Sequence, residues 1–184
     1  MRAIVQRLLE FWRPPVQREE AVDVGSLVKE IAAACEAELR TRGVELAVQV
    51  ADNAPAVRGN RERLRQMLEH LLNNAAQAIA AQEKARREDA IRLAVSHDAR
   101  AVQMIVSDTG PGFREPGKVF DLFYTTQAPG KGDGLGLSIC YGIAREHGGE
   151  ISAFNLHPRG AAVVVELPIA EVMRQESVVI EEVA

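Results

Sequence analysis

Asp108-Thr-Gly-Pro-Gly, Phe120-Asp-Leu-Phe-Tyr-Thr-Thr and Gly130-Lys-Gly-Asp-Gly-Leu-Gly-Leu-Ser follow one another between residues 108 and 138. Asp108 comes directly after the apolar, β-branched run 102–106, so we expect its carboxylate at the end of a strand. Gly110 and Gly112 flank a proline, a spacing that demands a tight turn and lets a ligand approach the backbone. The later glycines lead into a helical pattern, and a helix start binds anions through N–H groups without internal partners. The stretch predicts a phosphate site, and a flexible surface loop is the alternative.

Two common phosphate-binding motifs do not match this stretch. In a P-loop the lysine follows the glycines, whereas Lys131 precedes the last of them. A dinucleotide fingerprint requires its glycines directly after the first strand of a βαβ unit, and here a long loop separates strand from helix. The glycine pattern therefore indicates a different kind of nucleotide or phosphate site.

Size and composition limit the classes of protein that remain. The chain has 184 residues, 47% of them hydrophobic, which suits one domain with a core of its own. A formal charge of −4 with interspersed signs argues against nucleic-acid binding as the main function. No run of about 18 apolar residues occurs. Cys35 and Cys140 lack metal-ligand spacing, so we expect both to be reduced, buried thiols of a cytosolic protein.

Helix and strand signals divide the chain into a small number of elements. We expect helices from the Asp23 N-cap to about Thr41, from the Asn60 N-cap to about Arg87 and from Leu135 to about His147. Strands are expected at residues 44–50, 91–95, 102–106, 151–154 and 161–167.

The second of these helices carries an unusual polar flank. An apolar arc runs from Leu64 to Ile79, and polar residues occupy the adjoining face, namely His70, Asn73, Asn74 and Gln77. Asparagine is a poor helix residue because its side chain competes for backbone hydrogen bonds. Two in succession beside a core therefore suggest a ligand contact, and a solvated face is the alternative.

The chain resembles the catalytic, ATP-binding domain of sensor histidine kinases, whose superfamily includes gyrase and the mismatch-repair ATPase MutL. Four motifs carry the resemblance, in the order of the N box, first glycine box, F box and second glycine box: Leu68-Glu-His-Leu-Leu-Asn-Asn-Ala, Asp108-Thr-Gly-Pro-Gly, Phe120-Asp-Leu-Phe-Tyr-Thr-Thr and Gly132-Asp-Gly-Leu-Gly-Leu. The wording of the F box is closest to nitrogen-regulation-type kinases. The resemblance implies the Bergerat fold, an α/β two-layer sandwich with a mixed, mainly antiparallel sheet covered on one face by about three helices.

The resemblance also implies roles for particular residues. Asn74 would hold Mg²⁺ through its side-chain oxygen, and together with His70 it would serve catalysis. Asp108 would accept a hydrogen bond from the exocyclic amine of adenine, which selects ATP over GTP. The implied nucleotide contacts are Asn74, Gln77, Asp108, Gly110, Gly112, Phe123, Thr125, Thr126, Lys131, Gly132, Gly134, Leu135, Gly136 and Leu137. ATP and Mg²⁺ are thus the expected cofactors.

Three positions depart from the family pattern. His70 stands where the family often has Asn or Glu, and it could act as a weak base, position a water or be only a polar helix residue. Gln127 replaces a frequent lysine, which leaves Lys131 as the expected lid cation. Ala161 follows Gly160 where the family often has a threonine hydroxyl.

The family's phosphoacceptor histidine is missing, because none of the first 69 residues is histidine. We therefore expect a piece of a longer kinase: residues 1–15 as the end of a dimerisation helix, 16–22 as a linker, 23–168 as the catalytic domain and 169–184 as an acidic tail. Such a chain would bind ATP and need a histidine-bearing domain in trans.

The expected partners follow from the same resemblance. They are ATP, the phosphoacceptor histidine domain of the same kinase and the receiver domain of a response regulator, with no nucleic acid and no direct membrane contact. We expect a cytoplasmic monomer, and a membrane anchor in a longer parent stays open. A nucleotide-binding regulatory module resembling anti-sigma factors is the alternative function. A hydrolysing ATPase is disfavoured because those relatives carry glutamate where His70 stands.

Overall fold

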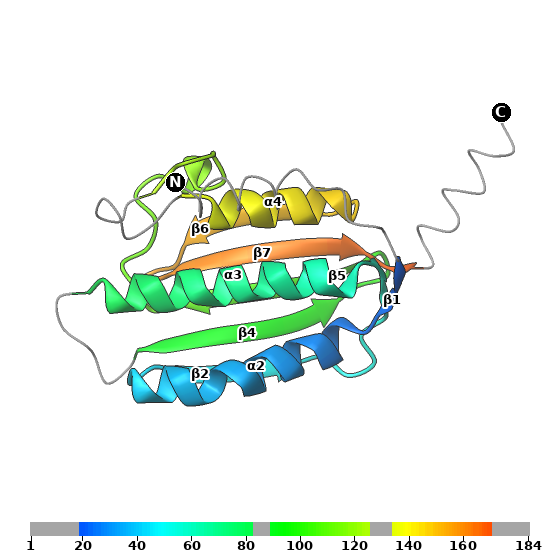
Figure 1. Ribbon diagram of the computed structural model, residues 1–184, viewed down its shortest axis with the longest axis horizontal. Coiled ribbons are helices and arrows are strands. Elements are labelled where there is room, and N and C mark those ends of the chain that lie inside the picture. Colours follow the sequence, from blue (N-terminus) through cyan, green and yellow to red (C-terminus); the bar gives the residue numbers. More distant parts are fainter. Residues whose placement is uncertain (1–18, 83–88, 126–133, 171–184) are drawn as a thin grey trace, which may run out of the picture.

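A five-stranded β-sheet forms one layer of the protein, and helices cover one of its faces (Figure 1). The computed structural model describes residues 19–82, 89–125 and 134–170. In sheet order the strands are β2 (Glu45–Val50), β4 (Ala90–His97), β5 (Ala101–Asp108), β7 (Ala161–Pro168) and β6 (Glu150–Asn155). The helices are α2 (Val24–Thr41), α3 (Arg61–Ala80) and α4 (Gly136–Glu146).

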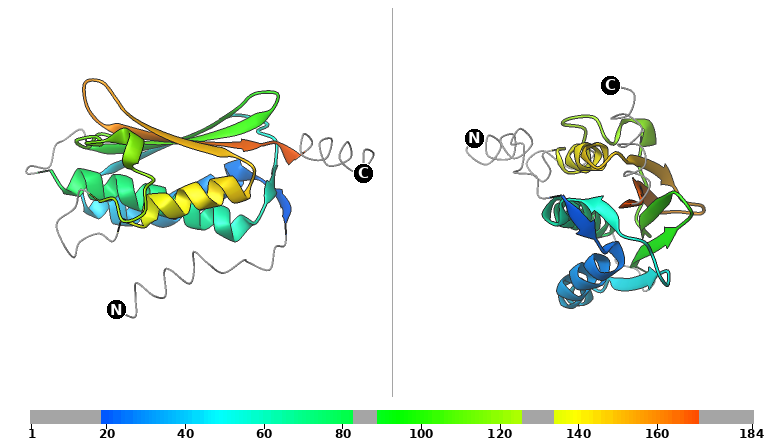
Figure 2. Two further views of the ribbon diagram at one scale, coloured as in Figure 1. Left: turned by 90° about the horizontal axis from the view of Figure 1, so that it is seen from above. Right: turned by 90° about the vertical axis from the view of Figure 1, so that its right-hand side faces the viewer.

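The sheet is mixed but mainly antiparallel. β2 pairs with β4 in parallel, and the pairings β4–β5, β5–β7 and β6–β7 are antiparallel. Seen from two further directions, the strands and the helices form separate layers (Figure 2). The predicted two-layer sandwich is therefore confirmed. No described helix combines the length and the apolar character needed to cross a membrane.

Three short elements were not predicted from the sequence. β1 (Glu20–Val22) pairs antiparallel with β3 (Val57–Gly59), and η1 (Pro116–Lys118) is a 3-10 turn ahead of the F box. β1 lies in the segment expected to be a linker, and it forms because Val22 and Val57 both bury their side chains in the core. Val57 also bridges to Ile169, so both ends of the described chain meet at β3.

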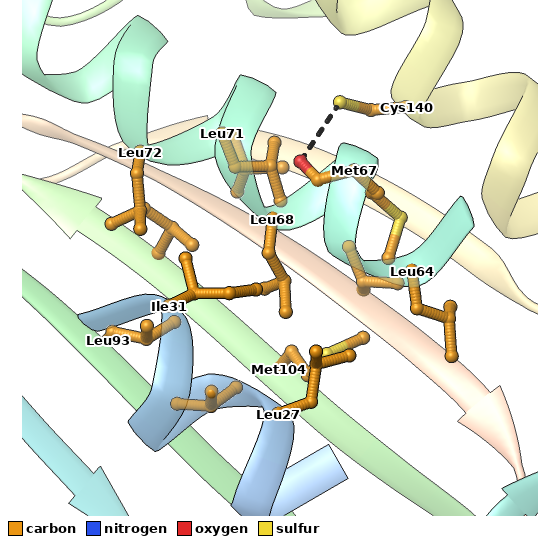
Figure 3. Packing of buried hydrophobic residues seen from close by; sticks show 14 of the residues in the cluster. Leu27, Ile31, Leu64, Met67, Leu68, Leu71, Leu72, Leu93, Met104 and Cys140 are labelled. Carbon is orange, nitrogen blue, oxygen red and sulfur yellow. Dashed lines mark hydrogen bonds between the residues drawn. The ribbon is translucent and has the colours of Figure 1, made fainter. Parts of the chain in front are cut away.

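The core lies between the sheet and the helices. Along β5, Val102, Met104 and Val106 point toward the helices and are buried, while the residues between them stay partly exposed. Figure 3 shows how residues of α2 and α3 meet residues of the sheet there: Leu27, Ile31, Leu64, Met67, Leu68, Leu71, Leu72, Leu93 and Met104. Leu72 and Ala76 are buried as well, so the apolar face of α3 is broader than the predicted arc.

The two cysteines are free, as expected, but only one of them is buried. Cys140 of α4 donates its S–H to the carbonyl oxygen of Met67 at 3.6 Å (Figure 3), and burial raises the pKa of its thiol. Cys35 is half-buried on α2, which corrects the expectation that both thiols would be enclosed.

Both predicted N-caps are confirmed. Asp23 Oδ1 accepts a hydrogen bond from the Ser26 N–H at 2.8 Å, and Asn60 Oδ1 accepts from the N–H groups of Glu62 and Arg63 at 2.9 and 3.1 Å. These bonds satisfy backbone donors that a helix start leaves without internal partners.

The predicted end of α3 near Arg87 is wrong. The helix ends at Ala80, and Ala81 closes it with a backbone N–H bond to the Gln77 carbonyl. The Gln82 side chain then donates to Asp89 Oδ1 at 3.3 Å, which ties the residues after the helix to the start of β4.

α4 lies antiparallel to α3, and matched contacts run along their length. His147 directly follows α4, and its Nε2 accepts a hydrogen bond from the Asn60 N–H at 3.1 Å. Its Nδ1 therefore carries the proton, which it donates to the Ile143 carbonyl at 2.7 Å. One turn on, the Arg63 guanidinium binds both carboxylate oxygens of Glu146 at 2.7 and 3.0 Å. This register brings the start of α4 beside the middle of α3.

Replacing Asn60 by alanine should lower the free energy of unfolding by about 1 kcal/mol, because two backbone N–H groups lose their acceptor. The melting temperature should fall by about 2–4 °C, measured by calorimetry. Asn60→Asp is the matched control, since it keeps the accepting oxygen. Equal losses in both variants would show that the cap bonds are not the cause.

Candidate functional site

Asp108 is a buried carboxylate at the end of the central strand β5. Its side chain is 7% exposed, and its Oδ1 accepts a hydrogen bond from the Gly110 N–H at 2.8 Å. Burial raises the pKa of Asp108, while hydrogen bonds from the Gly110 and Ala161 N–H groups and the charge of Arg159 oppose that rise. The result is a carboxylate oriented by the backbone and available for a polar ligand group.

The glycines after Asp108 are required by close contacts. A Cβ at Gly110 would lie 2.7 Å from Asp108 Oδ1 and 3.2 Å from the Ala78 backbone of α3. Gly112 has φ +84°, a conformation that L side chains rarely adopt, and a Cβ there would meet Asn155 Oδ1 at 2.8 Å. The turn therefore packs directly between α3 and the end of β6.

Asn155 fixes the chain just beyond that turn. Its Oδ1 accepts the Phe113 N–H at 2.6 Å, and its Nδ2 donates to the Phe113 carbonyl at 2.9 Å. An amide side chain thus pairs with a peptide group as a neighbouring strand would. The sequence analysis missed Asn155, because the partner lies 42 positions away and no motif joins the two.

The turn between β6 and β7 holds a second group that the sequence analysis missed. Arg159 reaches Asp89 at 3.3 Å and Gln82 at 3.4 Å, linking the turn to the start of β4 and the end of α3. The Asp89 side chain is 3% exposed, and that of Arg159 is 25% exposed. Gly160 follows, and its backbone lies directly against the Asp108 carbonyl.

The polar flank of α3 has His70 opposite the start of α4. His70, Asn74 and Gln77 are half-buried, whereas Asn73 is exposed. A Cβ built on Gly136 would lie 3.9 Å from His70 Nδ1, which places His70 opposite the first turn of α4. Of the two asparagines, Asn74 is thus the one at the border of the core, as predicted.

The start of α4 is shaped by the F box. Phe123 has φ +65° and is 58% exposed, and its N–H donates to the Gly134 carbonyl at 3.1 Å. A Cβ on Gly134 would overlap the Phe123 backbone at 2.5 Å, so packing against the F box already requires this glycine. Phe120 is half-buried, packs on the core and contacts the Tyr141 ring at 6.0 Å between centroids.

The remaining predicted site residues differ in position. Leu135 is buried and is the N-cap residue of α4, and its apolar side chain makes no capping hydrogen bond. Leu137 is half-buried against the core, and Thr125 is exposed. Thr126, Lys131 and Gly132 lie outside the described residues.

Together these groups form a site with two chemically different ends. One end presents the Asp108 carboxylate between glycine backbones, which suits a planar base with an amino group. The other combines the start of α4, where the helix dipole favours anions, with the amide of Asn74, a neutral oxygen ligand for a hard cation. In the described ranges there is no group of three His, Cys, Asp or Glu that could hold a metal.

This arrangement is that of an ATP-binding domain. Residues 59–171 match the family described as "Histidine kinase-, DNA gyrase B-, and HSP90-like ATPase", and the chain belongs to this family.

The similar proteins are sensor histidine kinases. The sensor histidine kinase ZraS of Escherichia coli O157:H7 is 29% identical over 168 residues, which cover 90% of this chain and 35% of ZraS. The catalytic domain of the histidine kinase ThkA superposes with a TM-score of 0.71 at 28% identity, covering 83% of this chain and 98% of that domain. The structure of full-length ShkA in complex with AMPPNP superposes with a TM-score of 0.75 at 26% identity, and the match covers 91% of this chain and 35% of ShkA. The chain thus spans about a third of ZraS.

Asp108→Asn should stabilise the ligand-free protein at neutral pH by about 1 kcal/mol, a size typical of single stabilising substitutions. The pKa of Asp108 is raised in the folded protein, so the charged Asp108 side chain lowers the free energy of unfolding at pH values above that raised pKa. Below the pKa of an aspartate in the unfolded chain, the residue is protonated in both states and this cost is absent. The advantage of the variant should therefore shrink as the pH falls, measured by urea unfolding at several pH values.

Asp98→Asn serves as the control of opposite sign. The N–H groups of Arg100 and Ala101 lower the pKa of Asp98, so its charge stabilises the fold above the unfolded pKa and that benefit disappears in acid. Asp98→Asn should destabilise the protein at neutral pH. A destabilised Asp108→Asn protein at neutral pH would contradict the assignment of a costly buried charge.

Proposed function

We propose that this chain binds Mg²⁺-ATP and presents the γ-phosphate to a histidine on a separate domain of a two-component sensor kinase. The observation that carries the proposal is the pairing of a buried, backbone-oriented carboxylate at Asp108 with a glycine-flanked helix start at Gly136. The relatives support it, since they are sensor histidine kinases and one similar structure contains AMPPNP.

Asp108 supplies base selection in this proposal. An ionised carboxylate only accepts hydrogen bonds, so it matches the exocyclic amine of adenine and opposes the carbonyl of guanine at the same place. Gly110 and Gly112 would let the backbone lie close to the nucleotide, and a Cβ at Gly110 would lie 2.7 Å from Asp108 Oδ1. Gln77, half-buried one turn beyond Asn74, would face the nucleotide on the α3 side.

The phosphate end relies on α3 and α4. The backbone N–H groups of residues 134–137 would bind phosphate oxygens, and the Asn74 amide oxygen would be a protein ligand of Mg²⁺. His70, opposite Gly136, would position a water or accept a proton as a weak base. Bound Mg²⁺-ATP supplies the phosphoryl group, and this chain contributes orientation and charge neutralisation.

The F box and the segment after it complete the proposed site. Phe123 directly precedes the expected lid of about residues 124–133, and Thr125, Thr126, Lys131 and Gly132 belong to it. Phe123 is exposed in a left-handed conformation next to Gly134, which suits a hinge between the lid and α4. Lys131 would be the lid cation that contacts phosphate.

The wider context of the chain is also a proposal. Residues 1–15 would end the dimerisation helix, 16–22 would link it to the catalytic domain of 23–168, and 169–184 would be an acidic tail. The partners would be the phosphoacceptor histidine domain of the same kinase and a response regulator receiver domain. A monomeric, cytoplasmic chain of the nitrogen-regulation type fits this role.

Calorimetric titration tests the nucleotide site directly. The chain should bind ATP in the presence of Mg²⁺ and reject GTP, and Asp108→Asn should weaken ATP binding by about 10–100-fold, because a hydrogen bond to a charged group is lost. With ATP bound, the chain should phosphorylate an isolated histidine-bearing dimerisation domain. ATP binding with no transfer would favour a regulatory module of the same fold.

Asn74→Ala should lower the affinity for Mg²⁺-ATP by at least about tenfold and remove most of the Mg²⁺ dependence. The reason is that the amide oxygen is the proposed ligand of the ion. Asn73→Ala is the matched control, since it removes the same side chain from the adjacent, exposed position. Titrations with and without Mg²⁺ distinguish the two, and equal effects of both substitutions would refute the role of Asn74.

A further inference from the structure

Arg159 is a partly buried cation at the base end of the site with no role in the resemblance. Its guanidinium is held by Asp89 at 3.3 Å and by Gln82 at 3.4 Å. The next residue, Gly160, packs its backbone against the Asp108 carbonyl, and the one after it, Ala161, donates its N–H to the Asp108 side chain. The β6–β7 turn thus places Arg159 directly before the two residues whose backbone contacts Asp108.

The protonation state of Asp108 decides which base the site can accept. The ionised carboxylate only accepts hydrogen bonds, and this suits the amino group of adenine. The neutral acid carries an O–H donor, which can bind the carbonyl that guanine has at that position. Discrimination between ATP and GTP therefore requires the ionised form, although burial favours the neutral one.

Among the described residues around Asp108, Arg159 is the source of positive charge. α3 presents Ala78 to the neighbouring Gly110, β4 pairs Ile91 with Asp108 and β7 pairs Ala161 with it, and none of these residues is charged. The charge of Arg159 lowers the pKa of Asp108, together with the Gly110 and Ala161 N–H groups. Asp89, the other charged group at this end among the described residues, is bound to Arg159 itself.

We propose that Arg159 is a positioning residue that keeps Asp108 in the form that accepts from adenine, so that the ion pair with Asp89 maintains selection of ATP over GTP. This proposal rests on the proposed function as a nucleotide-binding domain. Asp89 and Gln82 matter because they hold a flexible arginine at a fixed place beside the site.

The first experiment needs no nucleotide. The carboxyl carbon of Asp108 is followed by NMR as the ligand-free protein is titrated with acid. Arg159→Gln should move the Asp108 titration to higher pH, and Arg159→Lys should keep it near the wild-type position. Arg100→Gln is the matched control, because this exposed arginine stands at the opposite end of β5. An unchanged titration in Arg159→Gln would overturn the proposal.

A double variant tests the same point if Arg159→Gln alone destabilises the fold. Arg159→Gln alone removes the cation that binds the buried Asp89 in the described structure, which is destabilising. Asp89→Asn combined with Arg159→Gln removes both charges and avoids that penalty. The same upward movement of the Asp108 titration is expected in the double variant, and a wild-type titration there would count against the role of Arg159.

The second experiment measures selectivity. Affinities for ATP and GTP are determined between about pH 5 and pH 8, where proteins are generally most stable, and their ratio cancels the titration of the phosphates. In Arg159→Gln the preference for ATP should fall severalfold, and the fall should begin at higher pH than in wild type. Arg159→Lys should restore most of the preference. Asp108→Asn, which always carries a donor, should show a low ratio that does not vary with pH.

The outcomes separate this inference from the function on which it rests. Failure of the wild type to bind ATP would refute the proposed function, while the NMR titration would still test the effect of Arg159 on Asp108. ATP binding with a wild-type preference in Arg159→Gln at every pH would refute the inference alone. An equal, pH-independent loss in Arg159→Gln and Arg159→Lys would also refute it, because shape and not charge would then be responsible.

Discussion

A buried carboxylate at the end of the central strand constrains the structure around it. Placing Asp108 at 7% exposure removes water from its oxygens, so the protein must supply other hydrogen-bond donors. The donors are backbone N–H groups from the turn at Gly110 and from the start of β7 at Ala161. Both turns must approach closely, and glycines at 110 and 160 permit that approach. The local chain path therefore follows from satisfying one charged group.

α3 connects this carboxylate to the opposite end of the site. Near its C-terminus, Ala78 packs against the turn at Gly110, and two turns earlier His70 faces Gly136. The helix is in turn fixed against α4 by the Arg63–Glu146 ion pair and the His147 hydrogen bonds. A rigid, well-packed helix thus sets the distance between the base end and the anion end. Its apolar face packs in the core, and its polar flank carries the proposed site residues His70, Asn74 and Gln77.

Several structural features that depend on residues close together in the sequence were predicted correctly. The N-caps at Asp23 and Asn60, the hairpin of β4 and β5 and the polar flank with Asn74 all depend on neighbours a few residues away. β1 and β3 were missed because strands of three residues form only through pairing and burial at Val22 and Val57. Asn155 and Arg159 were missed because their partners lie 42 and 70 positions away along the chain.

The missed residues share a physical character that motifs do not capture. Asp108 and the glycines of the two glycine boxes are the residues that a nucleotide would contact in the proposed site. Asn155 and Arg159 instead bind neighbouring backbone and side-chain groups that keep those residues in position. Such support can be provided by many combinations of residues, since only a hydrogen bond to a turn or a charge near a carboxylate is needed. In this chain the support comes from the β6–β7 connection. Asn155, the last residue of β6, binds the Phe113 backbone, and Arg159 in the following turn binds the Asp89 carboxylate. These two side chains therefore anchor the β6–β7 connection to the Phe113 backbone and to Asp89, and so hold in place the backbone that surrounds the buried Asp108.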